Sequence, residues 1–373
     1  MKKVLIVSRN FPPLLGGMEQ LNLHLAEEIS RRCVTRLIAP EGAEKYIPDE
    51  IRLTRIPAKP LSRFLVKAAW CALREARAFR PDVILAGSGL MAPMVLAAAR
   101  ICDARAVAYA HGLDLTVPHP VYRAIWRPAL RRLDAVIVNS RATSGLAEAI
   151  GIVPDRVTII HPGVSLPEPD PDARLRFRRT HDLGDGPILL SVGRLAARKG
   201  LREFVAEVLP LVVARYPDLR LVVIGDAPSD ALYAATQSVD SIIAAAQAAG
   251  VERCLRFLGR RFGTEFSDAY AGADLYVFPV RAIPNDPEGF GMVAVEAAAH
   301  GLPTVAYATG GVVDAVREGV SGYLAPAGDA QAFAGLVCRA LEQTLPKTGI
   351  RRFAEQFAWP RFGEKIQAFL ETL

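Results

Sequence analysis

The sequence predicts an α/β protein built from two doubly wound, parallel-sheet domains, and three observations support this prediction. Short β-branched runs alternate with longer helical patterns along the chain, which is typical of strand–helix–strand units. The alternation stops in a Pro- and Asp-rich stretch at residues 161–175 and then restarts, so we interpret this stretch as a linker. A length of 373 residues also exceeds what one core of ordinary size contains.

The expected strands form one group on either side of the linker. They lie at 4–8, 36–39, 82–86, 106–110, 135–139 and 157–160 in the first group, and at 187–192, 219–225, 254–259, 275–279 and 304–308 in the second. We therefore expect Rossmann-like domains at residues 1–165 and 166–356, followed by a last helix at 357–373. Ligands of such sheets bind outside the carboxyl ends of the strands, so we expect a ligand in a crevice between the two domains.

Composition indicates a soluble globular protein of the cytoplasm. The apolar run after Lys3 ends at Ser8, so we expect a first buried strand here rather than a signal peptide. The longest apolar stretch, residues 90–101, contains Pro93 and is shorter than the roughly 20 residues that a membrane-spanning helix needs. Five cysteines without a C-x-x-C pair argue against a zinc site and a disulfide framework, and they favour a reducing compartment.

The positive charge of the chain is concentrated in its first part. Residues 1–165 hold 23 Lys and Arg against 14 Asp and Glu, a net charge of +9, whereas residues 166–373 hold 22 against 25, a net charge of −3. Much of the excess lies in segments 60–81 and 121–134, and apolar residues recur at helical spacing in the first of these. Such a helix fits a solvated surface and contact with anionic lipid equally well, and no nucleic-acid motif accompanies the charge.

Four stretches that follow predicted strands carry candidate ligand-binding residues, and two of them lie in the second domain. In SVGRLAARKG, residues 191–200, Arg194 and Lys199 flank the start of an expected helix, and two cations at a helix N-terminus suit a diphosphate leaving group. In EGFGMVAVE, residues 288–296, a Gly-Phe-Gly turn heads an expected helix between Glu288 and Glu296. Because a carboxylate accepts hydrogen bonds from two neighbouring hydroxyls, one glutamate can hold a sugar and the other a ribose, with a diphosphate on the amides between them.

The other two stretches lie in the first domain. Gly16 and Gly17 follow the first strand and permit close approach of a ligand to the backbone. His111 and Gly112 follow the strand at 106–110. Each pair taken alone also fits a structural role, as a tight turn or as a buried histidine.

Taken together, these residues resemble the retaining glycosyltransferases of the two-domain GT-B architecture, and the chain is similar to glycosyltransferase family 4. The segment from Glu288 to Glu296 matches the family's signature of two glutamates separated by seven residues. Further features agree in order and spacing along nearly the whole chain: Gly16-Gly17, His111-Gly112, HPGV at 161–164, SVGRLAARKG at 191–200, VIGD at 223–226, VFP at 277–279, and GLPTVA at 301–306 followed by Gly310-Gly311.

The resemblance implies roles for these residues. Arg194 and Lys199 would bind the donor diphosphate and stabilise the leaving nucleotide, and Glu296 would take the ribose hydroxyls. The transferred sugar and the phosphate would be held by Glu288 and by the amides of Phe290, Gly291, Met292 and Val293. Gly16 and Gly17 would contact the diphosphate, and His111 would touch the sugar near the reacting carbon.

No cofactor and no metal ion is expected, because Arg, Lys and helix amides can offset the diphosphate charge. The one D-x-D sequence, Asp170 and Asp172, lies in the linker, and we interpret it as a solvated loop.

The resemblance further implies a hexosyltransferase that uses a nucleotide-diphosphate sugar and retains the anomeric configuration. The first domain would bind the acceptor, a saccharide or a lipid-linked saccharide, and the last helix would pack back on this domain. We expect a role in cell-surface polysaccharide or glycolipid biosynthesis, with the basic first domain at the inner face of the membrane. Residues 227–250 depart from the family pattern, since they are longer and more helical than its short glycine-rich turn, which leaves the base-binding side open.

Three alternatives to this interpretation are considered. GSGLMA at 87–92 fits the dinucleotide-binding pattern G-x-G-x-x-A, with Asp103 and Asp114 further on, so an NAD-dependent oxidoreductase is one of them. Against it, the pattern lies on a later unit than the first, and Pro93 is expected to break the following helix early. The other two are a non-catalytic sugar-nucleotide-binding subunit and a nucleotide-sugar epimerase.

Overall fold

The computed structural model describes residues 1–226 and 236–373, which form two compact units. The first unit consists of Met1–Gly163 and Trp359–Leu373, and the second of Val164–Ala358. The boundaries lie at 163/164 and 358/359, within two residues of the predicted 165/166 and 356/357.

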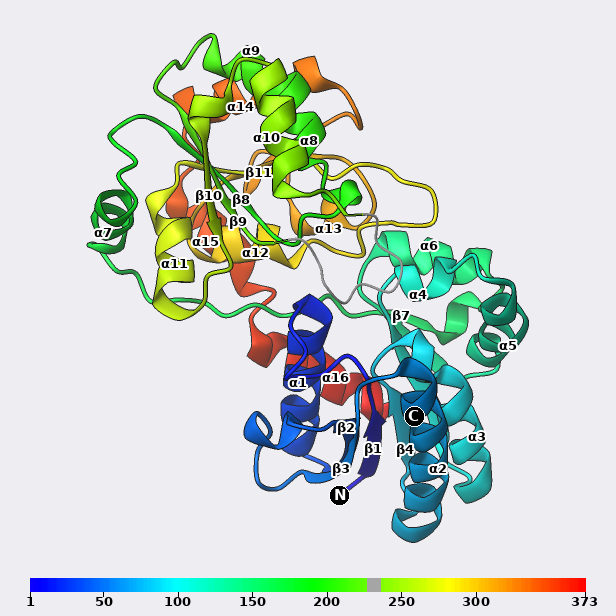
Figure 1. Ribbon diagram of the computed structural model, residues 1–373. Coiled ribbons are helices and arrows are strands. Elements are labelled where there is room, and N and C mark those ends of the chain that lie inside the picture. Colours follow the sequence, from blue (N-terminus) through cyan, green and yellow to red (C-terminus); the bar gives the residue numbers. More distant parts are fainter. Residues whose placement is uncertain (227–235) are drawn as a thin grey trace. The chain divides into compact units, whose positions relative to one another are not determined.

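The first unit contains a seven-stranded, all-parallel sheet (Figure 1). Its strand order is β3-β2-β1-β4-β5-β6-β7. The strands are β1 Lys3–Val7, β2 Val34–Pro40, β3 Arg52–Ile56, β4 Val83–Ala86, β5 Arg105–Ala110, β6 Ala135–Val138 and β7 Val157–Ile159. The helices are α1 Gly17–Ser30, α2 Leu61–Phe79, α3 Ala92–Cys102, α4 Leu113–Thr116, α5 Pro120–Arg131, α6 Arg141–Ala149 and α16 Trp359–Glu371, with short 3₁₀ turns at Ala43–Lys45, Gly89–Met91 and Pro154–Arg156.

Helices cover both faces of this sheet because both faces are apolar. Successive side chains of a strand point to opposite faces, so Val4 and Ile6 of β1 join one core cluster while Leu5 and Val7 join another. The first cluster contains residues of α1 and α16, and the second contains residues of α2 and α3 (Figure 1). The chain's last helix, α16, therefore belongs to the first unit and packs beside α1.

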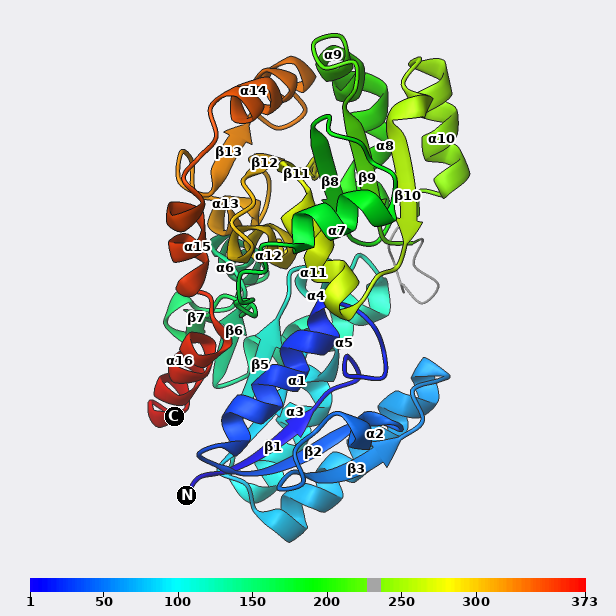
Figure 2. The ribbon, with the colours of Figure 1, turned by 90° about the vertical axis from the view of Figure 1, so that its left-hand side faces the viewer.

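The second unit contains a six-stranded parallel sheet with the order β10-β9-β8-β11-β12-β13 (Figure 2). The strands are β8 Ile188–Val192, β9 Arg220–Ile224, β10 Leu255–Gly259, β11 Leu275–Phe278, β12 Thr304–Tyr307 and β13 Gly322–Ala325. One core cluster takes side chains from α8 Leu201–Glu203, the π-helical turn Phe204–Val208, α9 Leu209–Val213, α10 Val239–Ala248 and α14 Ala330–Glu342. A second cluster takes them from α7 Ala173–Thr180, α11 Gly263–Gly272, α12 Met292–Ala299, α13 Val312–Ala315 and α15 Lys347–Glu355.

The predicted α/β architecture is confirmed, and each of the eleven expected strands is present. Strands β3 and β13 were not predicted. The strand β3 lies at the edge of its sheet, and its charged sequence RLTRI has only one buried residue. The strand β13 begins at Gly322, where a Cβ would lie 1.9 Å from the carbonyl oxygen of Thr304, so a residue type that disfavours strands is needed there for close packing.

One local expectation was wrong. Helix α3 runs from Ala92 to Cys102, and Pro93 lies in its first turn, where the missing N–H would have no intrahelical partner in any case. Pro93 therefore does not break this helix. Of the stretch 227–250, residues 227–235 lie outside the described part of the chain, and the expected helical character of the remainder is confirmed by α10.

In the described parts of the chain, no helix combines the length and the apolar character needed to cross a bilayer.

Candidate functional site

The central feature of the second unit is a pair of loops at the carboxyl ends of β8 and β11. The turn after β8 contains Arg198 and Lys199, and the loop after β11 contains Asp286 and Glu288. The Nζ atom of Lys199 lies 2.9 Å from Oε2 of Glu288, and Nε of Arg198 lies 3.0 Å from the same oxygen. The guanidinium of Arg198 also reaches Oδ1 of Asp286 at 3.1 Å. Two cations and two carboxylates from segments about ninety residues apart thus form one ion-pair network.

Glycines allow the two loops to pack closely. A Cβ on Gly200 would lie 2.1 Å from the carbonyl oxygen of Pro279, and its φ of 68° also favours glycine. On the other side of Glu288, its backbone oxygen accepts a hydrogen bond from the Gly311 N–H at 2.9 Å. A Cβ on Gly311 would approach the oxygen of Gly289 to 2.0 Å. The backbone and the carboxylate of Glu288 are therefore both fixed by neighbouring segments.

The electrostatics of this network keep Glu288 ionised. Burial alone would raise the pKa of Glu288, but the adjacent Lys199 and Arg198 outweigh it and lower the pKa to about 2. Burial lowers the pKa of Lys199, and the attraction of Glu288 opposes this effect. Because the ammonium of Lys199 and the carboxylate of Glu288 lie within hydrogen-bonding distance, each stabilises the charge of the other, and the two form a charged pair.

Glu296 lies on helix α12 in a different environment. The hydroxyl of Tyr270 donates a hydrogen bond to its Oε2 at 3.0 Å. Burial raises the pKa of Glu296, and the bond from Tyr270 and the charge of Lys199 counteract only part of this rise. The ring of Tyr270 stacks on His300, with centroids 4.8 Å apart, and the Nδ1 of His300 lies 2.8 Å from the backbone oxygen of Glu296. Glu296 is thus held by a small, partly buried network formed by α11, α12 and the residue that follows α12.

The start of α12 provides backbone donors. Gly291 is the N-cap residue with a φ of 102°, and a Cβ there would meet the ring of Phe278 at 2.9 Å, so glycine is required. The first N–H groups of a helix have no intrahelical partner, which leaves the amides of Met292 and Val293 directed out of the helix start. The Phe290 side chain is buried in the core, 5.6 Å from the ring of Phe357, and it anchors the turn.

Arg194 is placed differently from Lys199. Its side chain is exposed, and within the described residues no hydrogen bond or ion pair of this side chain is found. It is near enough for its charge to lower the pKa of Lys199. Both cations precede the start of a helix, as expected: Ala197–Lys199 form a 3₁₀ turn, and α8 begins at Leu201 after its N-cap Gly200.

In the first unit, Gly16 and Gly17 lie at the start of α1, as expected, but an acidic side chain lies beside them. Glu19 is buried, and its Oε1 accepts a hydrogen bond from the Asn10 side chain at 3.0 Å. A Cβ on Gly16 would lie 2.4 Å from Oε2 of Glu19. Glu19 was not among the predicted residues, although an acid in the first turn of a helix is favoured by the helix dipole. The carboxylate of Glu19 thus occupies the space that a side chain at position 16 would need.

His111 lies at the end of β5 and is buried. Its Nε2 is 2.9 Å from the carbonyl oxygen of Gly87; since a carbonyl only accepts, Nε2 is the donor, and Nδ1 of the neutral ring is an acceptor. The carboxylate of Asp114 accepts hydrogen bonds from the N–H groups of His111 at 2.9 Å and Gly112 at 3.1 Å. It also accepts one from Gly89 at 2.7 Å. Asp114, considered above only for an NAD site, therefore joins the loops after β4 and β5.

The GSGLMA stretch is explained by this packing. A Cβ on Gly87 would lie 2.6 Å from both Oδ1 of Asn22 and Oγ of Ser8, and a Cβ on Gly89 would lie 3.1 Å from Asp114. The glycines thus accommodate side chains of this unit. The Gly89 N–H donates to the carboxylate of Asp114 and is therefore not available to a dinucleotide phosphate. This contact argues against an NAD-dependent oxidoreductase.

Candidate metal ligands are not gathered in the described residues: no group of three or more His, Cys, Asp or Glu side chains is placed to hold a metal ion in residues 1–226 and 236–373. Asp170 and Asp172 are exposed, and Asp170 pairs with Arg176 at 2.7 Å.

Comparison with known proteins identifies the family. The family model of the glycosyl transferases group 1 matches residues 186–343, and that of glycosyltransferase family 4 matches residues 15–167. The GDP-mannose-dependent alpha-(1-6)-phosphatidylinositol monomannoside mannosyltransferase of Mycolicibacterium smegmatis is 30% identical over 343 residues, which cover 88% of this chain and 86% of that protein. The D-inositol 3-phosphate glycosyltransferase of Geodermatophilus obscurus is 32% identical over 258 residues, covering 67% of this chain and 55% of the relative.

Solved structures agree in fold. HepE from Anabaena superposes with a TM-score of 0.82 at 21% identity, with 100% of both chains covered. Sucrose-phosphate synthase from Thermosynechococcus elongatus gives a TM-score of 0.77 at 21% identity, covering 100% of this chain and 99% of that one. The protein is therefore a glycosyltransferase with the GT-B fold. Within that class, it belongs to glycosyltransferase family 4.

Proposed function

We propose that the protein is a retaining hexosyltransferase that moves a sugar, with mannose as the first candidate, from a nucleotide-diphosphate donor to a lipid-linked or saccharide acceptor. The observation that carries the proposal is the Lys199–Glu288 pair at the head of α12, with Glu296 on the same helix. Mannose is suggested by the relative from Mycolicibacterium smegmatis, whose name states a GDP-mannose donor and a phosphatidylinositol monomannoside acceptor. The HepE structures, which contain UDP or UDP-glucose, support a nucleotide-sugar donor of this general kind.

In this proposal each polar group has one task. Lys199 and Arg194 bind the diphosphate, together with the amides of Met292 and Val293. Glu288 accepts hydrogen bonds from the transferred sugar, and Glu296 accepts them from the ribose hydroxyls. Phe290 and Gly291 shape the turn that presents these amides.

From the first unit, Gly16 and Gly17 contact the diphosphate, and His111 binds the sugar near the reacting carbon.

The chemistry requires that negative charge be stabilised on the departing phosphate. The bond between the anomeric carbon and the phosphate oxygen breaks, and the acceptor hydroxyl attacks the carbon from the same face, so the configuration is retained. The hydroxyl proton passes to the departing phosphate oxygen. Lys199 and Arg194 supply the positive charge that a metal ion provides in other transferases, so we propose that the reaction is independent of divalent metal.

The decisive experiment is a transfer assay with GDP-mannose, UDP-glucose and other nucleotide sugars, using phosphatidylinositol mannosides and simple glycosides as acceptors, with and without EDTA. Transfer with retained anomeric configuration, established by NMR of the product, supports the proposal; inversion or full loss with EDTA contradicts those parts of it. The variant Glu288→Gln should lose transfer while it still binds the nucleoside diphosphate. Reduction or oxidation of a nicotinamide cofactor with no transfer would favour the oxidoreductase instead.

We also propose that helix α2 places the first unit on anionic membrane lipid. Val66 and Trp70 are 71% and 60% exposed. The exposed cationic residues of this helix are Arg63, Lys67, Arg74 and Arg77. The helix's acidic residue, Glu75, is buried and pairs with Arg36 at 2.6 Å. Exposed large apolar side chains that alternate with cations on one helix are typical of a helix that lies on the surface of an anionic membrane.

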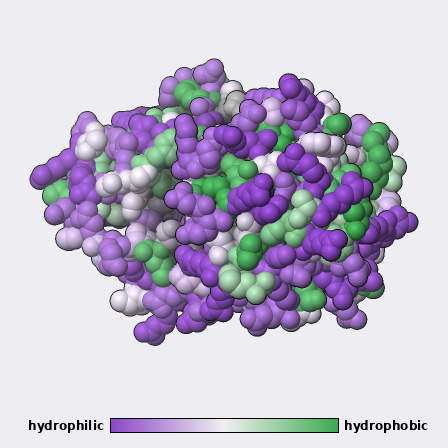
Figure 3. All heavy atoms as spheres, turned by 90° about the horizontal axis from the view of Figure 1, so that it is seen from below, coloured by the Kyte–Doolittle hydropathy of each residue, from purple (hydrophilic) through white to green (hydrophobic). Residues whose placement is uncertain are grey.

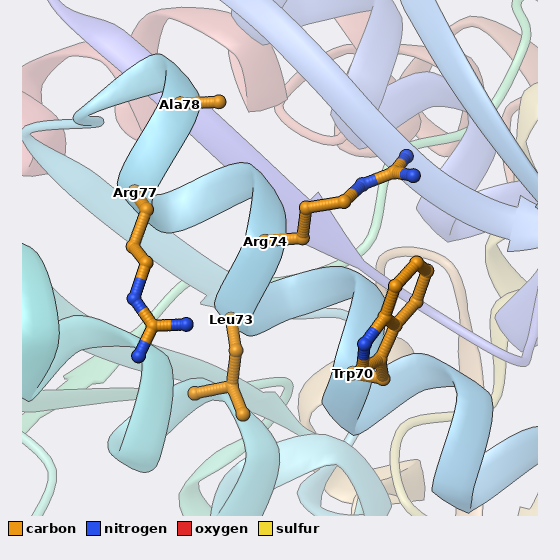
Figure 4. Close-up of a pocket in the computed structure, with 5 residues that line it drawn as sticks. All are labelled: Trp70, Leu73, Arg74, Arg77 and Ala78. Atoms are coloured by element: carbon orange, nitrogen blue, oxygen red, sulfur yellow. The ribbon is translucent and has the colours of Figure 1, made fainter.

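The side chains of α2 also form a shallow hollow. It has a volume of about 400 Å³ and is lined by Trp70, Leu73, Arg74, Arg77 and Ala78 (Figure 4). The Arg74 guanidinium lies 4.9 Å from the centre of the Trp70 ring and points to the same side of the helix. The face of the molecule shown in Figure 3 is mostly hydrophilic, with apolar residues in small groups.

Co-sedimentation with phosphatidylglycerol vesicles at low and high salt tests this surface. We expect binding at low salt that weakens at high salt and is lost in Trp70→Ser. The matched control is Phe262→Ser, because Phe262 is an equally exposed aromatic residue (66%) of the second unit. Absence of binding at low salt, or equal binding of both variants, contradicts the proposal.

A further inference from the structure

Arg198 connects the turn after β8 with three positions of the loop that ends at Glu288. Its backbone oxygen accepts a hydrogen bond from the N–H of Arg281 at 2.8 Å. Its Nη1 binds Oδ1 of Asp286 at 3.1 Å, and its Nε binds Oε2 of Glu288 at 3.0 Å. The side chain is only 11% exposed, and the loop includes a turn at Asn285 with a φ of 62°. Arg198 therefore defines the course of this loop as well as the position of its carboxylates.

The charges show why Glu288 needs Arg198 in addition to Lys199. Both cations share one carboxylate oxygen of Glu288. Under the proposed function, Lys199 must turn to the donor phosphate. Without Arg198, the buried carboxylate of Glu288 would then have no cation beside it, and its charged form would be strongly destabilised. Arg198 is held in place by Asp286 and can remain on Glu288. Its planar guanidinium suits this task, because it serves two carboxylates at once.

We infer that Arg198 is a positioning residue for the transfer reaction: it holds Glu288 and its loop in place and keeps Glu288 ionised while Lys199 binds the donor diphosphate. This inference rests on the proposed function. The groups that face the Glu288 carboxylate are Lys199 and Arg198 from the turn after β8, with Asp286 on its own loop. Burial raises the pKa of Tyr276 on β11, and the charges of Glu296 and Glu288 add to this rise.

The test compares Arg198→Gln and Arg198→Lys with the wild-type chain, using the donor that the wild type turns over. We expect kcat/KM of Arg198→Gln to fall on the order of ten- to a hundredfold, as a small displacement of a reacting group costs. The acid limb of its profile of kcat/KM against pH should move to higher pH, because Glu288 then keeps only one of the two cations that lower its pKa. Arg198→Lys keeps the charge but reaches only one carboxylate, so it should restore the acid limb and only part of the rate.

Arg202→Gln is the matched control, because Arg202 is half exposed and pairs only with Glu203 in the described chain. It should behave as the wild type. Equal loss of melting temperature in the Arg198 variants, with kcat/KM and the acid limb unchanged, would show a merely structural role and overturn the inference. Calorimetric titration of the wild type with GDP and UDP separates the two proposals. If the wild type binds and transfers and Arg198→Gln has the same kcat/KM, only the role of Arg198 is refuted. If the wild type binds neither nucleotide, the proposed function is refuted as well.

Discussion

The Tyr270–Glu296 hydrogen bond allows a direct test of the ribose site. Tyr270 is 1% exposed, and its hydroxyl donates to Glu296 at 3.0 Å. The variant Tyr270→Phe keeps the ring and its stacking on His300 but removes the only donor that the described side chains offer to this carboxylate. A hydrogen bond to a charged group is worth about 1.5–3 kcal/mol, which corresponds to roughly a ten- to hundredfold change in an equilibrium.

The expected result is weaker nucleotide binding that depends on pH. Burial already raises the pKa of Glu296, and loss of the Tyr270 bond raises it further. Because the ribose hydroxyls are bound by the ionised form, we expect the affinity of Tyr270→Phe for GDP or UDP to fall about tenfold at pH 6 and to recover in part at pH 8. Isothermal titration calorimetry at the two pH values measures this change.

Tyr276→Phe provides the matched control. Tyr276 is also fully buried, but its hydroxyl donates to the backbone oxygen of Val192 at 3.1 Å and not to Glu296. It should lose about 1 kcal/mol of stability and bind nucleotide as the wild type does. Wild-type affinity of Tyr270→Phe at both pH values would refute the assignment of Glu296 to the ribose.

Three further predictions concern stability and nucleotide binding. Arg178→Met should destabilise the second unit by about 3 kcal/mol, because the buried guanidinium of Arg178 donates to three backbone carbonyl oxygens as well as to Asp274, and these acceptors lose their donor. Arg174→Met, at a half-exposed arginine on the same carboxylate, should cost under about 1 kcal/mol. Chemical denaturation compares the two variants, and equal losses would contradict the reasoning. Gly200→Ala should abolish nucleotide binding, because its Cβ would clash with the carbonyl oxygen of Pro279 and displace the turn. Gly250 has a similar φ of 70° and no atom near its Cβ, so Gly250→Ala should lose only about 1 kcal/mol of stability and bind nucleotide normally. Calorimetry measures the binding of both variants, and thermal melting measures their stability. The Glu288 carboxylate has a pKa of about 2 against an ordinary 4.5, so its stabilisation is present above pH 4.5 and is lost as the pH falls toward 2; the difference in melting temperature between wild type and Glu288→Gln should shrink between pH 5 and pH 3, and a constant difference would count against the ion-pair network.

Most of the fold could be predicted from the sequence because buried parallel strands are short and continuous in apolar residues. β-branched runs such as VLIVS and AVIVN mark β1 and β6 without ambiguity. The edge strand β3 and the glycine-led strand β13 could not be predicted, since neither shows this pattern. A proline in the first turn of α3 was misjudged, because the position of a proline in a helix decides whether it disrupts the helix.

The candidate site shows the same division. The Glu-x₇-Glu spacing is a local pattern that indicated Glu288 and Glu296, and the position of SVGRLAARKG directly after a predicted strand indicated Arg194 and Lys199. Arg198 carries no such signal, as it is one of 45 Lys and Arg residues. Its importance follows from a contact with Asp286 across about ninety residues, which only folding creates. Asp114 was noted for the wrong reason, because its hydrogen bonds to the loops after β4 and β5 depend on how these strands lie side by side.

The sequence by itself determined the α/β class, the alternation of strands and helices and the identity of the residue types at the ends of the strands, because these properties are set by local preferences and by periodicity. Only the tertiary structure decided which cation meets which carboxylate, which glutamate stays ionised and which has a raised pKa. The physical reason is that pKa values and ion pairs depend on burial and on the distance between groups, and both arise only when segments far apart in the chain pack against each other.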